Sequence, residues 1–279
     1  MSKKIINIVI SIIILLISFY YTNKMINIFK DKDPIMVELK KYDKVYSDTK
    51  VDSIVLGDDI IPGLKGTKID INKSYSKMKK TGKFDKNLLV FKETVPENDL
   101  KNNYKKYIVS LNKNNNNISL VINLKNIDYI ERILSILNKH NVYATFFVTK
   151  NVFDNNLSIV KQIINNGNEV ELLSDNYSIY EVNKYNSVNK LISNEKLLFC
   201  LNKERDNDLL KSCETTKLYS IVPTIEKTNN LYSYIKNNLE NGMILMVSNK
   251  KSIVDELSST ISYIKQKGKN IVLLKSILE

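Results

Sequence analysis

Few residues of this sequence have side chains suited to proton transfer or to covalent chemistry. The chain has one histidine, His140, and two cysteines, Cys200 and Cys213. General acid–base catalysis usually uses a histidine or a pair of carboxylates with shifted pKa values. His140 stands beside Lys139 in the last turn of a predicted helix, where a partial positive charge suits the helix dipole. We therefore expect His140 to be structural.

The residues that follow the predicted strands are the main candidates for a binding site. In parallel α/β folds, ligand groups come from the carboxyl ends of the strands. The residues at these positions are Asn123, Leu124, Lys125, Thr149, Lys150, Ser174, Asp175, Asn176, Pro223, Thr224, Ser248, Asn249 and Lys250. Asp175 is the one carboxylate among them, whereas a catalytic zinc typically has three histidine or carboxylate ligands. Amide, hydroxyl and ammonium groups of this kind can hold a sugar or an anion.

Each of two further sets of residues has both a functional and a structural interpretation. Glu169 and Glu171 could form a replacement acid–base set with Asp175, but they alternate with apolar residues on one strand and are expected to line a polar face. Tyr177 and Tyr180 could stack on a sugar ring, or they could be ordinary half-buried tyrosines.

The two cysteines form an even pair in a segment that we place outside the membrane. Oxidising conditions there favour a disulfide between Cys200 and Cys213, with free buried thiols as the alternative. In the chain-entropy model such a bridge stabilises the fold by about 3 kcal/mol. Zinc binding is not expected, because no further ligand pair lies near.

Strand and helix patterns alternate from residue 118 to the end of the chain. Apolar segments at 118–124, 143–149 and 168–174 predict strands, and Ile127, Ile130, Ile133, Leu134 and Leu137 fall at helical spacing between two of them. Further strands are predicted near "KLYSIV", "MILMVS" and "NIVLL", each beside a helical segment. This alternation predicts an α/β domain over 118–279 with a largely parallel sheet, either a barrel or doubly wound.

The residues before position 118 divide into three predicted parts. Residues 5–21, "IINIVISIIILLISFYY", are long and apolar enough for a transmembrane helix, so we predict an uncleaved signal anchor within residues 1–22 and an extracytoplasmic C-terminal part. The alternative is a buried core helix. A lysine-rich stalk is expected over 23–50, and a small α+β unit with a polar linker over 51–117.

The net charge of +12 does not indicate a nucleic-acid-binding protein. The basic residues are scattered and almost all lysine, with Arg132 and Arg205 as the two arginines, whereas readers of bases and phosphates favour arginine. A modest attraction to anionic lipid or to an anionic wall polymer stays open, and the basic segment "NKSYSKMKKTG" could lie against lipid headgroups or simply be solvated.

Residues 118–279 resemble the catalytic domain of the polysaccharide deacetylase family, also called the NodB-homology or carbohydrate esterase family 4 domain. The resemblance rests on "ISLVINLKN", on "IERILSILNKHNVYATFFVT" and on "NGNEVELLS", and it extends to the closing strand, helix and strand. It implies an irregular (β/α) barrel. Members of the family remove acetyl groups from amino sugars by means of a divalent metal such as zinc.

The catalytic motifs of that family are replaced in this sequence. Asn123 and Leu124 stand where the TFDDG motif has its base and metal-binding aspartates, and Leu173 and Tyr177 stand where HSxxH has its metal-binding histidines. Ser248 stands at the acid histidine of the closing LHD motif, and "FCLNKE" stands near the position of the arginine motif. The resemblance therefore implies the fold, without the metal site or the mechanism.

These observations predict a membrane-anchored, extracytoplasmic protein with a degenerate active site. Its expected work is to bind cell-wall glycan or an envelope protein, without metal and without nucleic acid. The candidate ligand-binding residues are Asn123, Lys125, Asp175, Asn176, Tyr177 and Asn249. The alternatives are an N-deacetylase that acts through a non-standard site and a purely structural spacer in the envelope.

Overall fold

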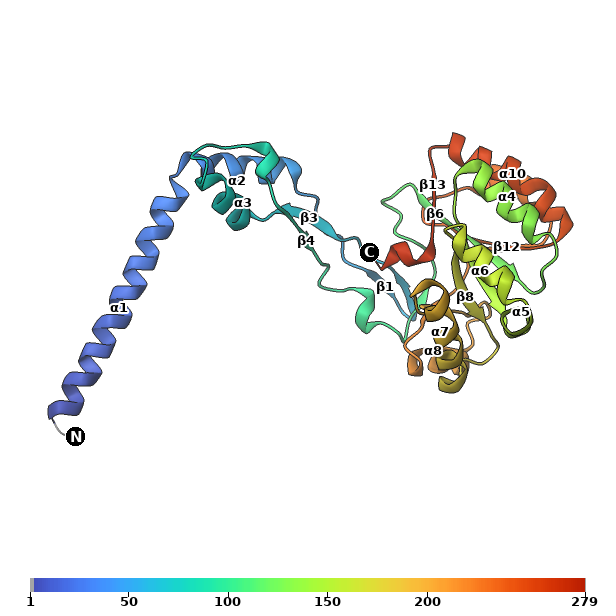
Figure 1. The fold of residues 1–279 in the computed structure, drawn as a ribbon, viewed down its shortest axis with the longest axis horizontal. Helices are drawn as coiled ribbons and strands as arrows, with labels where there is room; N and C mark the ends of the chain where they lie inside the picture. The colour runs from blue at the N-terminus through green and yellow to red at the C-terminus, as the bar shows by residue number, and fades with distance from the viewer. Residues whose placement is uncertain (1–2, 279) are drawn as a thin grey trace. The chain divides into compact units, whose positions relative to one another are not determined.

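The chain folds into two compact units, shown in Figure 1. A computed structural model describes residues 3–278. The smaller unit is made of Met1–Lys50 and Lys65–Val95, and the larger unit is made of Val51–Leu64 and Pro96–Glu279. The segment 51–117 therefore contributes residues to both units.

A parallel sheet of six strands forms the centre of the larger unit. Its order is β11 (Ile225–Lys227), β12 (Ile244–Ser248), β6 (Asn117–Leu124), β7 (Thr145–Thr149) and β8 (Glu169–Leu173), and β13 (Asn270–Val272) pairs with the beginning of β6. The central strands have almost continuous apolar sequences because both faces of a parallel sheet are buried.

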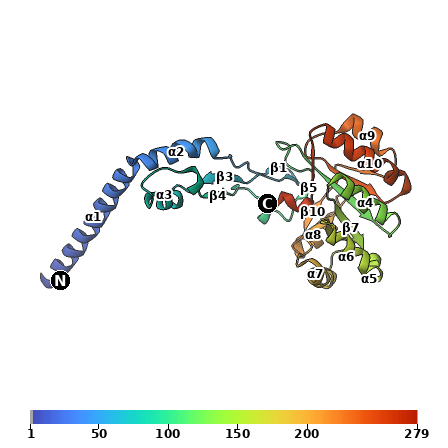
Figure 2. The same cartoon turned by 45° about the horizontal axis from the view of Figure 1, so that its top comes forward.

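Helices follow the strands along the chain, and most of them pack on one face of this sheet. They are α4 (Ile130–His140), α5 (Lys150–Asn155), α6 (Leu157–Asn165), α7 (Ile179–Ser193), α8 (Asn207–Thr215), α9 (Leu231–Asn238), α10 (Lys251–Gln266) and the short η3 (Leu274–Ile277). Figures 1 and 2 show α4 and α10 side by side. Ile133 and Leu137 of α4 and Leu257 and Ile261 of α10 are buried in the main core.

A second sheet packs against the inner face of the first. Its order is β1 (Ile54–Leu56), β2 (Asp59–Ile61), β5 (Tyr107–Ile108), β10 (Tyr219–Ile221) and β9 (Phe199–Leu201), with η2 (Leu100–Asn102) before β5. All of its pairs are parallel except β1 with β2. Phe199 and Ile221 of this sheet share one apolar cluster with Val121, Phe147 and Met246 of the first.

The two sheets meet at β8 and β9 through side chains instead of strand pairing. The Glu171 carboxylate accepts from the backbone N–H groups of Leu198, at 3.0 Å, and of Phe199, at 3.1 Å. The Tyr177 hydroxyl donates to the carbonyl of Leu172 and accepts from the N–H of Leu201. The predicted α/β class and parallel sheet are thus confirmed. The predicted barrel is not confirmed, because the described strands form two sheets and neither is closed.

The smaller unit contains the apolar N-terminal helix and a small α+β fold. Its elements are α1 (Lys3–Asp31), α2 (Pro34–Tyr46), β3 (Gly66–Ile69), α3 (Ile71–Lys79), η1 (Lys86–Leu88) and β4 (Phe91–Thr94), with β3 and β4 antiparallel. Ile35, Leu39, Ile69 and Met78 form its core. Within α1, the segment Ile10–Asp31 of 22 residues suffices, by length and composition, to cross a membrane.

Candidate functional site

A cavity of about 330 Å³ lies at the carboxyl ends of β6, β8 and β9. It is lined by Asn123, Lys125, Leu173, Ser174, Asp175, Leu201, Asn202, Lys203, Glu204, Asp206 and Leu209. The structure thus brings together three of the predicted ligand-binding residues, Asn123, Lys125 and Asp175. The cavity lies where a parallel α/β fold usually presents its ligand-binding groups.

Asn123 is a buried polar residue of this cavity, with 2% of its surface exposed. It stands one residue before the end of β6, in register with Phe147 of β7 and Ser248 of β12. Its side-chain nitrogen donates to Glu226 at 3.3 Å, but its Oδ1 atom has no hydrogen-bond partner within residues 3–278, and neither does Ser248 Oγ. Because leaving such a buried atom unpaired costs about 1–3 kcal/mol, Asn123 Oδ1 marks a place for a water or a ligand hydroxyl.

Lys203 brings a positive charge into the cavity beside Asn123. Its ammonium donates to both oxygens of Glu226 on β11, at 2.9 and 3.1 Å, and the two side chains are 29% and 31% exposed. An ammonium group has three N–H donors, so one donor remains for a ligand. Lys203, Glu226 and Asn123 form a continuous polar network, here called the Lys203 network.

The loop that carries Lys203 is held by its own hydrogen bonds and by an ion pair. Asn202 donates to the carbonyl of Asp206 and accepts from its N–H group, both at 2.8 Å. Arg205 forms a bidentate pair with Asp59 of β2, at 2.6 and 3.1 Å. These contacts fix both ends of the loop, so Lys203 projects from a rigid support.

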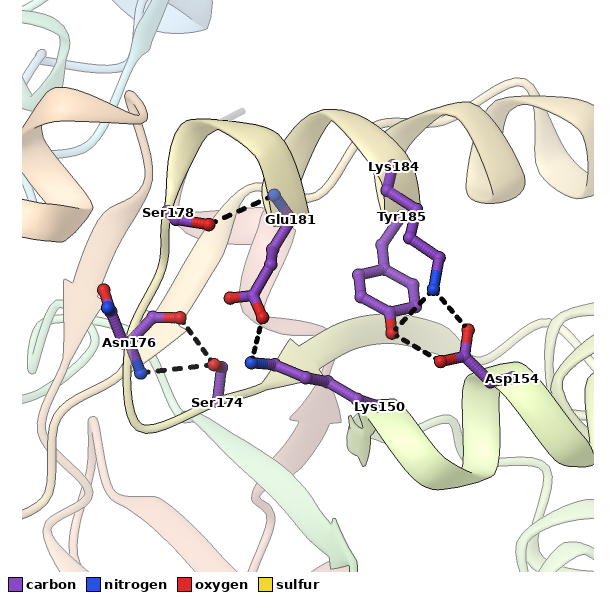
Figure 3. A network of polar contacts seen from close by, with 8 residues as sticks. All are labelled: Lys150, Asp154, Ser174, Asn176, Ser178, Glu181, Lys184 and Tyr185. Atoms are coloured by element: carbon purple, nitrogen blue, oxygen red, sulfur yellow. Dashed lines mark hydrogen bonds and ion pairs between the residues drawn. The ribbon is translucent and has the colours of Figure 1, made fainter.

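The opposite rim of the cavity is fixed by the polar network in Figure 3. Ser174 Oγ donates to the carbonyl of Asn176 at 2.6 Å and accepts from its N–H at 3.2 Å, and Ser178 caps α7. Lys150, at the start of α5, pairs with Glu181 of α7. These bonds hold the turn that presents Asp175.

A second ion pair in the same figure joins α5 to α7 farther along. Asp154 accepts from Lys184 at 2.8 Å and from the Tyr185 hydroxyl at 3.0 Å. The Lys184 ammonium, with help from Tyr185, holds the pKa of Asp154 below its usual range despite some burial. Asp154 is therefore a charged structural group and not a proton donor.

Three of the predicted ligand-binding residues do not line the cavity. Tyr177 is 1% exposed and uses its hydroxyl at the junction of β8 and β9, so its ring is more deeply buried than either open interpretation assumed and cannot stack on a sugar in the cavity. Asn249 donates to the carbonyls of Asn126 and Asp128, which fixes the loop after β6. Asn176 is exposed outside the cavity, and Tyr180 is 79% exposed.

Glu169 and Glu171 lie inside the fold, with 3% and 1% exposure, so the predicted polar face is wrong. Thr145 donates to Glu169 at 2.5 Å, and the other Glu169 oxygen has no partner among the described residues. Burial raises the pKa of Glu169 to about 7 and holds that of Glu171 well above its usual value, with the Glu169 charge as a second cause. Neither carboxyl lines the cavity, so neither can act on a ligand there.

The cysteines and the histidine have structural environments. Cys200 of β9 and Cys213 of α8 form a disulfide, as predicted. His140 Nε2 lies 2.8 Å from Ser258 Oγ. Burial first, and then the charges of Lys139 and Lys265, lower the pKa of His140, so the ring favours its neutral form and not the positive one expected from the helix dipole.

The residues at this site do not fit a divalent metal. Leu124 is fully buried in the core, Leu173 presents an apolar side chain, and Tyr177 is turned into the interior. Among residues 3–278, no three His, Cys, Asp or Glu side chains lie close enough to hold a metal ion. The Lys203 ammonium also lies beside Asn123, and a nearby positive charge opposes the binding of a cation.

Sequence reasoning missed Lys203, Glu204, Asp206 and Glu226. The first three follow β9, a strand of three residues that is too short to show a periodic pattern. Glu226 lies on β11, which is equally short. The signal that was available is "FCLNKE", which stands near the position of the family's arginine motif and contains Lys203.

Comparisons with known proteins agree with this description. Residues 111–205 match the family described as polysaccharide deacetylase. A Bacillus subtilis (strain 168) protein named "Uncharacterized protein YlxY" is 32% identical over 150 residues, which are 52% of this chain and 46% of that protein. The chain thus spans about half the length of this curated relative.

Solved structures show the same fold. Wild-type BA3943 of Bacillus anthracis, described as a carbohydrate esterase family 4 pseudoenzyme, has a TM-score of 0.67 at 24% identity, covering 88% of this chain and 95% of that one. A BA3943 mutant described as having restored enzymatic activity has a TM-score of 0.66 at 23% identity, covering 88% and 98%. Residues 111–205 thus match the polysaccharide deacetylase family, and the chain has the NodB-homology fold of these carbohydrate esterase family 4 structures.

Proposed function

We propose that this domain binds cell-wall glycan without hydrolysing it, from an anchor in the cell membrane. The observation that carries the proposal is the cavity at the strand ends, where the unpaired Asn123 Oδ1 and the Lys203 ammonium replace a metal site. The name of the similar protein BA3943 supports it, since that protein is described as a pseudoenzyme of the same family.

The side chains of the cavity match the chemistry of a sugar. Asn123 Oδ1 offers an acceptor for a hydroxyl, and Lys203 offers its third N–H as a donor. Asp175 on the other rim supplies a second acceptor. Leu173, Leu201 and Leu209 provide apolar surface for the C–H groups of a pyranose ring. Sites for small ligands commonly combine apolar walls with a few fixed polar groups.

The proposed location rests on two features. The Ile10–Asp31 segment of α1 has the length and hydropathy of a membrane-spanning helix. The disulfide between Cys200 and Cys213 suits an oxidising, extracytoplasmic compartment. Together they support a single-pass protein whose larger unit lies on the outer side of the membrane.

Binding to insoluble peptidoglycan and chitin, with and without soluble oligosaccharides as competitors, tests the proposal. The full chain in detergent is expected to bind saturably and to be displaced by sugar. Lys203→Ala removes the free N–H donor and leaves Glu226 without its ammonium, so binding should weaken about tenfold. The matched control Lys211→Ala removes an exposed lysine of α8 and should leave binding unchanged.

Acetate release, measured in the same samples, distinguishes the alternative functions. We expect glycan binding with no acetate above that of heat-denatured protein. Release of acetate would show an N-deacetylase with a non-standard site. Absence of any competable glycan binding would contradict the proposal and favour an envelope spacer or a protein partner.

A further inference from the structure

The positive charge of the chain is concentrated in the smaller unit. This unit contains eighteen lysines against eight aspartates and glutamates, a net charge of +10, whereas the larger unit has twenty-four basic and twenty-two acidic residues, a net charge of +2. The chain total is +12. The unit that contains the candidate membrane helix is therefore also the basic one.

Two lysines of helix α3 and the lysine that caps its C-terminus lie on one side. Ser74 and Met78 are its buried residues, one helical turn apart. Lys73, Lys77 and Lys80 lie at intervals of four and three residues on the opposite, exposed side. Lys73 lies 3.9 Å from Asp70, and no ion-pair partner of Lys77 or Lys80 is found in the described part of the chain. We call Lys73, Lys77 and Lys80 the α3 lysine row.

Several bonds attach α3 to the end of the candidate membrane helix. Lys30, in the last turn of α1, donates to Asn72 at 2.8 Å and lies over the ring of Tyr75. Asp33, which follows α1, accepts from the Tyr75 hydroxyl and from Lys79, both at 2.8 Å. The α3 lysine row is thus fixed close to the point where the candidate span ends at Asp31.

We propose that the α3 lysine row binds anionic phospholipid headgroups of the bilayer that α1 spans. The inference rests on the membrane anchor proposed above. Lysines near an anionic bilayer surface each add favourable electrostatic free energy, which falls off within a Debye length. A lipid surface suits this row better than a wall polymer, because α3 is bonded to the membrane helix itself.

Amine labelling of the full chain in liposomes tests this inference. The chain is reconstituted into phosphatidylcholine alone or into phosphatidylcholine with phosphatidylglycerol, and lysine acetylation is followed by mass spectrometry. Labelling of Lys73, Lys77 and Lys80 should slow about fivefold in the anionic liposomes, and high salt should abolish the difference. Lys161 and Lys236, exposed residues of the larger unit, serve as internal references.

Two triple variants distinguish an effect of the α3 lysine row from an effect of the net charge of the chain. In Lys73→Gln/Lys77→Gln/Lys80→Gln, the neighbouring Lys83 should lose its protection by anionic lipid. In the control Lys161→Gln/Lys211→Gln/Lys236→Gln, which removes the same charge from the larger unit, Lys83 should stay protected. Equal labelling in the two liposome types, with the protein bound to both, would overturn the inference.

Flotation of the same liposomes tests the anchor separately. A chain that floats with phosphatidylcholine alone has its anchor whatever the labelling shows. A chain that floats only with anionic liposomes, reversibly with salt, lacks the proposed anchor but supports lipid binding by the lysines. Protection by soluble poly(glycerol phosphate), without protection by anionic lipid, would assign the row to a wall polymer and overturn the lipid inference.

Discussion

Lys203 shows how one side chain can change the chemistry of a site. The ammonium is bonded to Glu226, and Glu226 is bonded to Asn123, so these three polar groups already form a charge-balanced network. A divalent metal there would have to displace this network, and the carboxylates that line the cavity, Asp175, Glu204 and Asp206, form no group of three that could hold it in the described part of the chain. A neutral sugar needs no such rearrangement.

Glu169 gives the protein a dependence of stability on pH. Burial raises its pKa to about 7, above the value of roughly 4.3 for glutamate in an unfolded chain. A group with a raised folded pKa contributes stability that is present below the unfolded pKa and lost as the pH rises through the folded pKa. Urea unfolding should therefore require less denaturant at pH 8 than at pH 5.

The variant Glu169→Gln should flatten this pH dependence, because glutamine resembles the protonated acid and does not ionise. The stability difference between wild type and variant at pH 8 should be of order 2 kcal/mol in favour of the variant. Glu240→Gln, at an exposed position paired with Lys113, is the control and should keep the wild-type profile. An unchanged slope in Glu169→Gln would mean that Glu169 ionises inside the fold without cost.

At the scale of elements, long periodic segments were predictable and short ones were not. The strands β6, β7, β8 and β12 and the helix α4 lie within one to three residues of the predicted segments, because each buries a continuous apolar run or stripe. The strand β9 has three residues, and no strand is predicted there. Because candidate site residues were taken from the ends of predicted strands, Lys203, which follows β9, was not among them.

The buried carboxyls show a second limit of sequence reasoning. Glu169 and Glu171 alternate with Val170 and Leu172, a pattern that predicts a polar face. Instead, the buried Glu171 carboxylate accepts hydrogen bonds from backbone N–H groups at the start of β9, which belongs to a different sheet. These bonds join two strands that do not pair with each other. Only the tertiary arrangement of the two sheets could reveal that use.

The disulfide joins β9 to α8 on either side of the loop that carries Lys203. The double variant Cys200→Ala/Cys213→Ala should lose about 3 kcal/mol in unfolding free energy, because the unfolded chain is no longer constrained by a loop. The two cysteines are 13 residues apart in the sequence. Denaturant unfolding with and without reductant measures this loss. Reductant should destabilise the wild type and leave the double variant unchanged; equal sensitivity of both would show that the bridge contributes nothing.

Gly167 closes helix α6 in a conformation that suits glycine. Its φ is +82°, and a Cβ atom there would lie 2.6 Å from the ring of Tyr143. Gly167→Ala should therefore lower the unfolding free energy by about 2 kcal/mol, from backbone strain and the ring contact together. Gly268→Ala is the matched control, because its φ is +70° and the space around it is open, so it should lose about 1 kcal/mol. Equal losses of unfolding free energy in the two variants would show that the Tyr143 ring moves aside without cost.

At the scale of the whole molecule, the two units have different chemistry. The smaller unit contains the apolar helix and most of the net charge, whereas the larger unit is nearly neutral and contains the cavity. This division suits a protein that is anchored by one part and binds glycan with the other. The net charge of +12 alone does not predict this division, because the two units are made of segments that interleave along the sequence.

Metal content tests most directly whether the Lys203 network has replaced the metal site. The purified full chain is exposed to zinc and to cobalt, desalted thoroughly and analysed by mass spectrometry, with Lys203→Ala treated in parallel. We expect no metal above the background of a heat-denatured sample, for either metal and in both proteins, since removing Lys203 does not restore three ligands. About one tightly held metal per chain in the wild type would contradict the replacement and make deacetylation the leading function.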